Sequence, residues 1–209
     1  MPRFLKALPL FLCLLVQAAT GRAQSTDNTW LEPADTVMAK AVDDGFGAKK
    51  LPKDARYHRV LNWLKPGLDA RIEVIPPVVC ALYQGQTAHD KLETKPTSAN
   101  AEAACNGVIT VILIHYSQSL NANWPCVFQK NDTTIQPTIK TLDSLPKVVT
   151  YYGGFIEGDV AGYRYMDVYT FAIPKDWHDS ASLVYADESG NHHTFNIDFA
   201  LFAKDVASR

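Results

Sequence analysis

The chain has 209 residues, 47% of them hydrophobic, and its formal net charge at pH 7 is −2. Without an excess of Lys and Arg it has no electrostatic footprint for nucleic acid, because such binding depends on cations opposite the phosphates. A chain of this length can bury a full hydrophobic core, so we expect one main domain with smaller additions.

The first 23 residues have the layout of a secretory signal peptide. Arg3 and Lys6 precede an uncharged apolar run from Leu8 to Ala19, and the segment closes with Gly21-Arg22-Ala23. We expect cleavage near Ala23 and a secreted or periplasmic protein. The apolar run of about 12 residues is shorter than the roughly 20 needed to cross a bilayer, so the mature chain is predicted to have no integral membrane segment. Cleavage removes three basic residues and no acid, which takes the formal net charge from −2 to −5.

Three cysteines follow the predicted signal peptide, namely Cys80, Cys105 and Cys126. An oxidising compartment favours one disulfide and one spare thiol. We favour the pairing of Cys80 with Cys105, because these two flank the polar stretch 84–103 and their bridge would close a long loop. The other pairings, and three buried thiols, stay open because connectivity cannot be deduced from sequence.

Residues 24–70 are predicted to form a short helical extension. Pro33 suits a first helical turn, and apolar residues with helical spacing follow it until Asp43-Asp44-Gly45: Val37, Met38, Ala41 and Val42. A second short helix is predicted from Asp54 to Pro66-Gly67, with one apolar face made of Tyr57, Val60, Leu61 and Leu64.

From Arg71 onward the pattern changes to strands. Residues 71–83 are predicted to form an edge strand or two bent strands, because Pro76-Pro77 interrupts them. The apolar run 107–116 is rich in β-branched residues and predicts a central strand buried on both faces. Residues 126–130 and 133–141 predict two shorter strands joined by a turn at Asn131-Asp132.

The C-terminal third has the clearest alternation. Alternate residues from Tyr163 to Ile173 are apolar or aromatic with the exception of Asp167, which predicts a strand with one face in the core. Strands near Leu183 and Phe195 flank the turn 187–191 and predict a hairpin. Several strands at short spacing, without alternating helices, predict a mainly β fold from residue 71 to 209, an antiparallel sandwich or barrel.

The segment Gly158–Tyr163, the strand that leads to Phe171-Ala172-Ile173-Pro174-Lys175-Asp176, and the closing hairpin resemble immunoglobulin-like domains of exported bacterial lipoproteins and surface proteins. The resemblance covers roughly residues 105–200. Asp159, Ala161 and Tyr163 also have the spacing of a tyrosine corner, while Tyr165 stands where an antibody domain has its second cysteine. The resemblance implies an immunoglobulin-like β-sandwich and a role in binding or assembly rather than catalysis.

No catalytic motif was found: the chain lacks HExxH, GxSxG and P-loop patterns. We expect no cofactor and no metal site, because His192 and His193 would point to opposite faces of one strand. We therefore expect a non-catalytic binding or assembly module for an unknown protein or glycan partner. Two alternatives are a carbohydrate-binding domain and, less favoured, a small secreted hydrolase. A possible aromatic ligand platform consists of Trp124, Tyr151, Tyr152 and Trp177.

Overall fold

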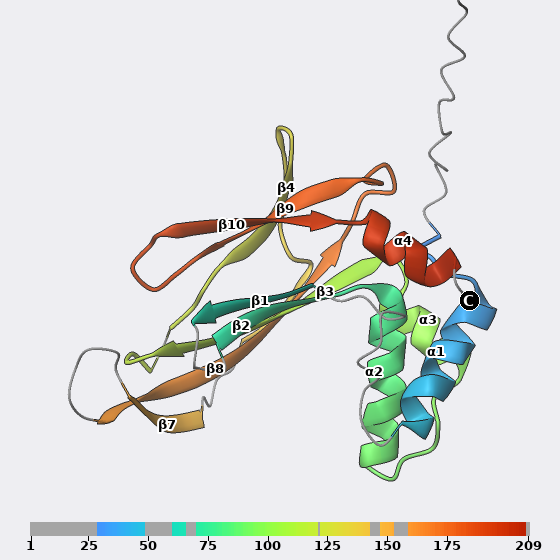
Figure 1. Ribbon diagram of the computed structural model, residues 1–209, viewed down its shortest axis with the longest axis horizontal. Coiled ribbons are helices and arrows are strands. Elements are labelled where there is room, and N and C mark those ends of the chain that lie inside the picture. Colours follow the sequence, from blue (N-terminus) through green and yellow to red (C-terminus); the bar gives the residue numbers. More distant parts are fainter. Residues whose placement is uncertain are drawn as a thin grey trace, which may run out of the picture.

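The computed structural model describes residues 29–48, 60–65, 70–120, 122–142, 147–152 and 159–207. The predicted signal peptide, and the predicted helix start at Asp54, lie outside these residues. The described chain is mainly β: two antiparallel sheets lie one above the other, and a group of helices projects to one side of them (Figure 1).

The larger sheet, sheet A, has the strand order β1-β2-β3-β8-β6, and β7 also pairs with β8. Its strands are β1 (Val60–Lys65), β2 (Ala70–Ile75), β3 (Val108–Ser117), β6 (Ile139–Thr141), β7 (Lys147–Tyr152) and β8 (Asp159–Ala172). The central pair is β3 and β8, which are in register from Val108 opposite Ala172 to Ser117 opposite Tyr163. The prediction of a central strand at 107–116 is therefore confirmed.

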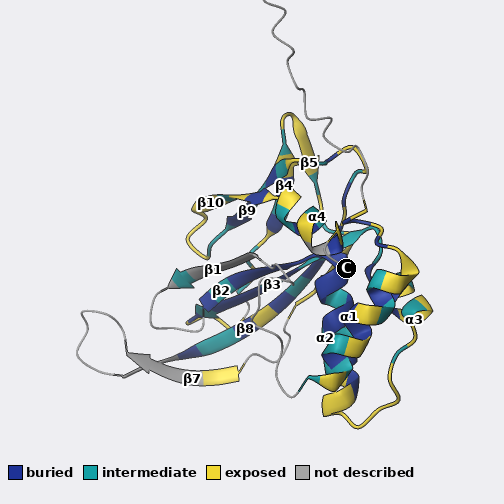
Figure 2. Cartoon of the chain, turned by 45° about the vertical axis from the view of Figure 1, so that its right-hand side comes forward, coloured by how far each residue is buried: buried dark blue, intermediate teal, exposed yellow. Residues whose placement is uncertain are grey.

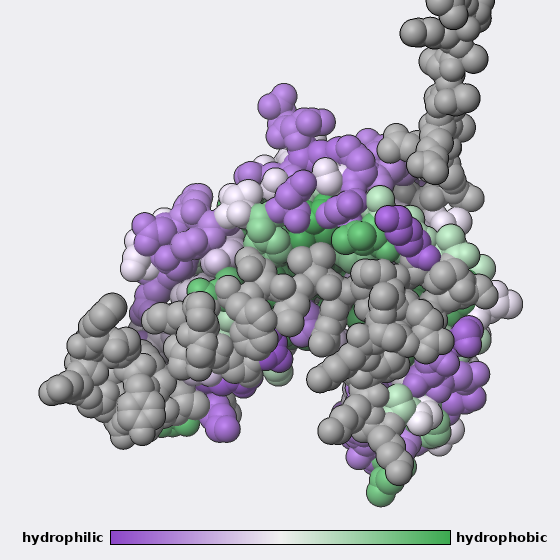
Figure 3. All heavy atoms as spheres, in the orientation of Figure 1, coloured by the Kyte–Doolittle hydropathy of each residue, from purple (hydrophilic) through white to green (hydrophobic). Residues whose placement is uncertain are grey.

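The smaller sheet, sheet B, has the order β10-β9-β4-β5. Its strands are β4 (Cys126–Lys130), β5 (Thr133–Ile135), β9 (Ser180–Ala186) and β10 (His192–Asp198). The predicted hairpin is confirmed as β9 and β10, and the predicted turn at Asn131 joins β4 to β5 with a left-handed φ of 51°. The strand predicted at 133–141 divides instead into β5 and β6, which belong to different sheets. The side chains over sheet B that face solvent in Figure 3 are mostly hydrophilic.

The hydrophobic core lies between the two sheets. Inward-facing side chains of β3 and β8 are completely buried, and Phe171 of β8 meets Phe128 of β4 edge to face, with ring centroids 4.9 Å apart. The buried face of β8 has the predicted period of two. On β3, burial on both faces was predicted, but one face is fully buried while the other carries partly exposed residues such as Thr110 and Ile112 (Figure 2).

Two helices of the side group cross at very close range. A Cβ atom on Gly45 of α1 (Asp35–Gly47) would lie 2.0 Å from the Leu82 carbonyl oxygen of α2 (Pro77–Asp90). A Cβ atom on Gly85 would likewise lie 2.2 Å from the Val42 carbonyl oxygen. Backbone therefore contacts backbone at this crossing, which only glycine permits. The C-terminal helix α4 (Ala200–Ala207) was not predicted.

The predicted disulfide is confirmed. Cys80 of α2 and Cys105, the last residue of α3 (Ser98–Cys105), are bonded, with their Cα atoms 5.9 Å apart. The bridge ties the start of α2 to the end of α3. The N-terminus of α3 is capped by Thr97, whose Oγ1 atom accepts a hydrogen bond from the Asn100 amide at 3.2 Å. Cys126 is the free cysteine of the described chain, and it is buried.

Three predictions around these helices are wrong. The described residues of the second predicted helix, 60–65, form strand β1 and pair with β2. A short apolar segment fits helical and extended periods equally well. Pro76-Pro77 ends strand β2 but also begins α2, with Pro77 in the first turn, so residues 77–83 are helical rather than extended. The polar stretch 84–103, which was expected to form a long loop, is helical in α2 up to Asp90 and again in α3 from Ser98.

Candidate functional site

A series of five stacked rings runs from the core to the surface. His115 lies between Tyr165 and Trp124 in this series, with ring centroids at 4.9 and 4.5 Å. Trp124 is followed by Tyr185 at 6.0 Å, and Tyr185 by His193 at 4.8 Å. All four interplanar angles are 22° or less. Because His115 belongs to sheet A and Tyr185 to sheet B, the Trp124 indole links the two layers.

The inner end of the series contains a buried polar pair. His115 and Asp167 are 0% and 1% exposed, and the Nε2 atom of His115 lies 2.9 Å from Oδ2 of Asp167. The Nδ1 atom of His115 and the indole Nε1 of Trp124 are buried without a hydrogen-bond partner among the described residues. Burying the His115–Asp167 pair and these two nitrogen atoms costs free energy of folding, and the packing of the surrounding residues compensates for that cost.

Two tyrosine hydroxyl groups fix the chain that leads to Trp124. Tyr165 donates to the Ser119 carbonyl at 2.6 Å, and Tyr169 donates to the Trp124 carbonyl at 2.8 Å. Both tyrosines lie on the buried face of β8. Trp124 therefore sits outside regular secondary structure but is anchored from two sides.

A cavity of about 290 Å³, here called the end pocket, opens beside Trp124. It lies where the end of β3, the start of β2 and the turn between β9 and β10 meet. Its walls are Leu64, Ala70, Tyr116, Trp124, Asp187, Glu188, Ser189 and His193. The pocket thus combines aromatic rings with two carboxylates.

Hydrogen bonds hold both carboxylates of the end pocket. Asp187 accepts from the backbone amides of Ser189 and Asn191, each at 2.9 Å, and from His193 Nε2 at 2.8 Å. The bond from His193 is the main reason why the pKa of Asp187 is lowered to about 2. Ser117 donates to Glu188 Oε1 at 2.7 Å. The pocket therefore presents fixed hydrogen-bond acceptors, with Asp187 charged at ordinary pH.

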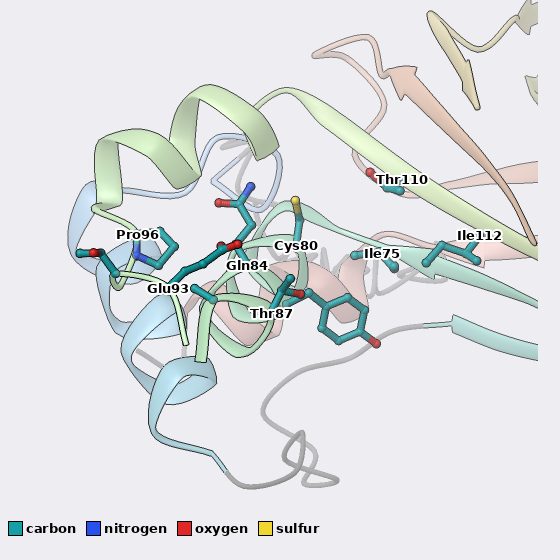
Figure 4. A pocket seen from close by; sticks show the side chains of 11 residues that line it. Ile75, Cys80, Gln84, Thr87, Glu93, Pro96, Thr110 and Ile112 are labelled. Atoms are coloured by element: carbon teal, nitrogen blue, oxygen red, sulfur yellow. The ribbon is translucent and has the colours of Figure 1, made fainter. Parts of the chain in front are cut away.

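A second hollow, here called the helix groove, has a volume of about 400 Å³ (Figure 4). It runs along one face of α2, between the segment 91–97 that follows this helix and the outer surface of sheet A. It is lined by Ile75, Cys80, Tyr83, Gln84, Thr87, Ala88, Glu93, Thr94, Pro96, Thr110 and Ile112.

The predicted aromatic platform is not assembled as one surface in the described chain. Trp124 lines the end pocket, but Trp177 is only 4% exposed and belongs to the hydrophobic core, where Lys130 Nζ lies 5.9 Å from its ring centroid. Tyr151 and Tyr152 lie on β7, and their side chains are outside the described part of the structure. Because Trp177 is buried, it cannot be part of an exposed ligand platform.

The residues around Trp124 were not identified from the sequence. Asp167 was the one signal of a buried polar site in the sequence, because it is the only charged residue among the alternate, otherwise apolar or aromatic positions from Tyr163 to Ile173. His115 was hidden within the apolar run of β3, and its pairing with Asp167 depends on the register of two strands about 50 residues apart along the chain.

Two potential nucleophiles, Cys126 and Ser117, lie near these sites. Burial raises the pKa of the Cys126 thiol to about 12, which keeps it protonated and unreactive. Ser117 is bonded to Glu188 rather than to a histidine. In the same residues there is no group of three or more His, Cys, Asp or Glu side chains that could hold a metal ion.

No protein-family model, curated protein or solved structure matches the chain. Among the helices that the structure describes, none has the length and apolar character needed to cross a membrane.

Proposed function

We propose that the protein is an exported, non-catalytic binding or assembly module, and that the end pocket receives the group it recognises. One observation carries this proposal: two carboxylates are fixed beside an anchored indole, at the mouth of a rigid stack of rings. Pre-organised polar groups next to aromatic walls are typical of recognition sites, because little ordering is needed when the ligand binds.

A cationic side chain of a protein partner fits the end pocket best. The Asp187 and Glu188 carboxylates accept hydrogen bonds and attract positive charge, and the ring of Tyr116 can add a cation–π contribution. His193 already bonds to Asp187, so Glu188 is the carboxylate more available to a partner's Lys or Arg.

The carbohydrate alternative has less support. Sugar stacking needs a free ring face, whereas the Trp124 indole already stacks against His115 of one sheet and Tyr185 of the other. Trp177 offers no face at all because it is buried. A hydrolase would need a convergent catalytic cluster. Around the end pocket Ser117 donates to Glu188 while His193 is bonded to Asp187, so the serine and the histidine have separate carboxylate partners.

Export and an immunoglobulin-like relationship remain part of the proposal. The Cys80–Cys105 disulfide supports an oxidising destination for the chain after its predicted signal peptide. The two antiparallel sheets around a shared core support the resemblance to immunoglobulin-like domains. Helices α2 and α3, placed between β2 and β3, would then be an addition to such a sandwich.

The test is a titration followed by NMR at the Trp124 indole and at the backbone amides of residues 187–193. The probes are N-acetyl-lysine amide, N-acetyl-arginine amide and N-acetylglucosamine. We expect both cationic probes to shift these signals, and Glu188→Gln to weaken their binding about three- to tenfold. Asp132→Asn, an exposed turn acid outside the pocket, is the matched control. Equal or tighter binding of the sugar would favour the carbohydrate alternative, and no response to any probe would contradict the proposal.

A further inference from the structure

The helix groove has walls that are held rigidly. Four of its lining residues recur at helical spacing on one face of α2: Cys80, Tyr83, Gln84 and Thr87. The disulfide fixes the start of this face to α3. Near its middle, the Tyr83 hydroxyl donates to Glu73 of β2, a carboxylate that is 6% exposed. The wall formed by α2 is thus tied covalently to a second helix and by a hydrogen bond to sheet A.

The opposite wall is a short segment with a defined backbone. Directly after α2, the Glu93 amide donates to the Ala88 carbonyl at 2.8 Å and the Leu92 amide to the His89 carbonyl at 3.0 Å. These two bonds form a Schellman motif, with Leu92 in the left-handed position at φ 58°. The motif turns the chain back along α2, and this return places Glu93 and Pro96 at the groove (Figure 4).

The chemistry of the groove changes from one end to the other. Ile75 and Ile112 line the end beside sheet A, whereas Thr87 and Glu93 line the end farther from it (Figure 4). Glu93 is the only lining residue with a formal charge, and its side chain reaches into the groove. The nearby Lys95 forms an ion pair with Asp43 of α1, with 2.7 Å between Nζ and Oδ1, so its charge is paired outside the groove.

From these features we propose that the helix groove is a second binding site, separate from the end pocket, for a small amphiphile with an apolar tail and an ammonium head. The tail lies against Ile75 and Ile112, and the head lies beside the Glu93 carboxylate. A volume of about 400 Å³ is within the range of small-molecule sites and is too small for a folded partner. A single carboxylate at one end selects a cationic head, and the apolar end supplies the hydrophobic contribution.

The test compares three probes with the same eight-carbon chain: n-octylammonium, n-octanol and n-octanoate, each titrated below its micellar range. Binding is followed at the backbone amides of residues 83–88 and 110–112. We expect n-octylammonium to bind about tenfold more tightly than n-octanoate, because one ion gains an attraction and the other a repulsion at a partly exposed carboxylate. Equal affinities, or shifts confined to the end pocket, would overturn the proposal.

Four variants make the assignment specific. Thr87 is exposed, so Thr87→Trp should fill the groove and weaken binding at least tenfold, whereas Thr87→Ala should leave it within twofold. Glu93→Gln should remove the preference for ammonium over carboxylate while keeping the binding of n-octanol. Asp90→Asn, an exposed acid on the same helix that does not line the groove, is the control. Undiminished binding in Thr87→Trp, or self-association through this face at rising protein concentration, would contradict a small-molecule site.

Discussion

The imidazole of His115 and the carboxylate of Asp167 form a hydrogen-bonded pair that is buried in the middle of sheet A. They lie on adjacent strands, with Asp167 opposite Leu113 and therefore diagonal to His115. Both side chains point to the core face, where their neighbours are apolar or aromatic. A polar pair in such a place is costly to form and even more costly to break, because the remaining partner stays buried.

We therefore expect Asp167→Ala to lower the free energy of unfolding by about 3–5 kcal/mol. Urea unfolding followed by Trp fluorescence is the measurement, and Asp132→Ala in the exposed β4–β5 turn is the control, with an expected change within about 0.5 kcal/mol. Replacing both residues, as in His115→Leu with Asp167→Leu, should cost less than Asp167→Ala alone. A loss below about 1 kcal/mol for Asp167→Ala would contradict the structural role of the pair.

Gly85, like Gly45 on the facing helix, is expected to tolerate no side chain at the α1–α2 crossing. Its Cβ would lie 2.2 Å from the backbone oxygen of Val42, and a backbone atom cannot move aside as a flexible side chain can. Gly85→Ala should therefore destabilise the protein by about 1–3 kcal/mol, or more if α1 separates from α2. A Cβ atom on Gly47, at the end of α1, would meet no heavy atom within 4 Å.

Gly47→Ala is thus the matched control, and it should be neutral or slightly stabilising. Thermal unfolding followed by circular dichroism compares the two variants under identical conditions. The prediction fails if the two substitutions change the melting temperature equally.

Leu92 offers a stabilising substitution. It occupies the left-handed position after α2 with a side chain that is 94% exposed, so it has backbone strain without compensating packing. Leu92→Gly should raise the free energy of unfolding by about 1 kcal/mol, less the extra freedom of glycine in the unfolded chain. Leu92→Ala keeps the strain and should give no such gain, which separates the backbone effect from loss of the side chain. Chemical denaturation of the three proteins measures both differences.

The sequence predicted strands best where one pattern decided them. Two patterns were compatible with a strand only: the alternation from Tyr163 to Ile173 and the β-branched run in β3. Both strands were confirmed. The segment 60–65 was compatible with both a helix and a strand, since six residues are too few to distinguish the two periods, and only the pairing with β2 selects the strand. Pro76-Pro77 has the same ambiguity, because proline both ends strands and begins helices.

The end pocket could be predicted only in part. Trp124 was expected to take part in binding, but its stacking partners come from β3 and β9, which are far apart along the chain. Their proximity is set by how sheet A packs on sheet B, and no local pattern encodes that packing. The pairing of Cys80 with Cys105 was favoured because these two cysteines flank one polar segment, but the sequence left the other pairings open, and the structure decides between them.

The thiol of Cys126 is expected to be silent in the folded protein. Because burial raises its pKa to about 12, almost no thiolate is present at pH 8. The fourth cysteine of the sequence, Cys13, lies in the predicted signal peptide, so the experiment uses a Cys13→Ser background. In this background Ellman's reagent at pH 8 should detect no reactive thiol in the folded protein. It should detect one after denaturation and three after denaturation with reduction of the Cys80–Cys105 bridge. Rapid reaction of the folded protein would contradict the burial of Cys126.

The bond between His193 and Asp187 makes stability depend on pH at the acidic end. The pKa of Asp187 is about 2 in the folded protein, below its ordinary value of 3.8, so the ionised form is the one that folding stabilises. This contribution is fully present above about pH 4 and is lost as pH falls from about 4 to about 2. His193→Asn removes the main cause of the shift, so the pKa of Asp187 should rise toward its ordinary value. The variant should be less stable than the native protein at pH 5, and this difference should close by pH 2.

His192→Asn changes the neighbouring exposed histidine, which points to the other face of β10, and serves as the control. Carboxyl ¹³C titration of Asp187 and urea unfolding at pH 2 and pH 5 measure the two effects. An unchanged Asp187 titration in His193→Asn would contradict the assignment of this hydrogen bond as the main cause.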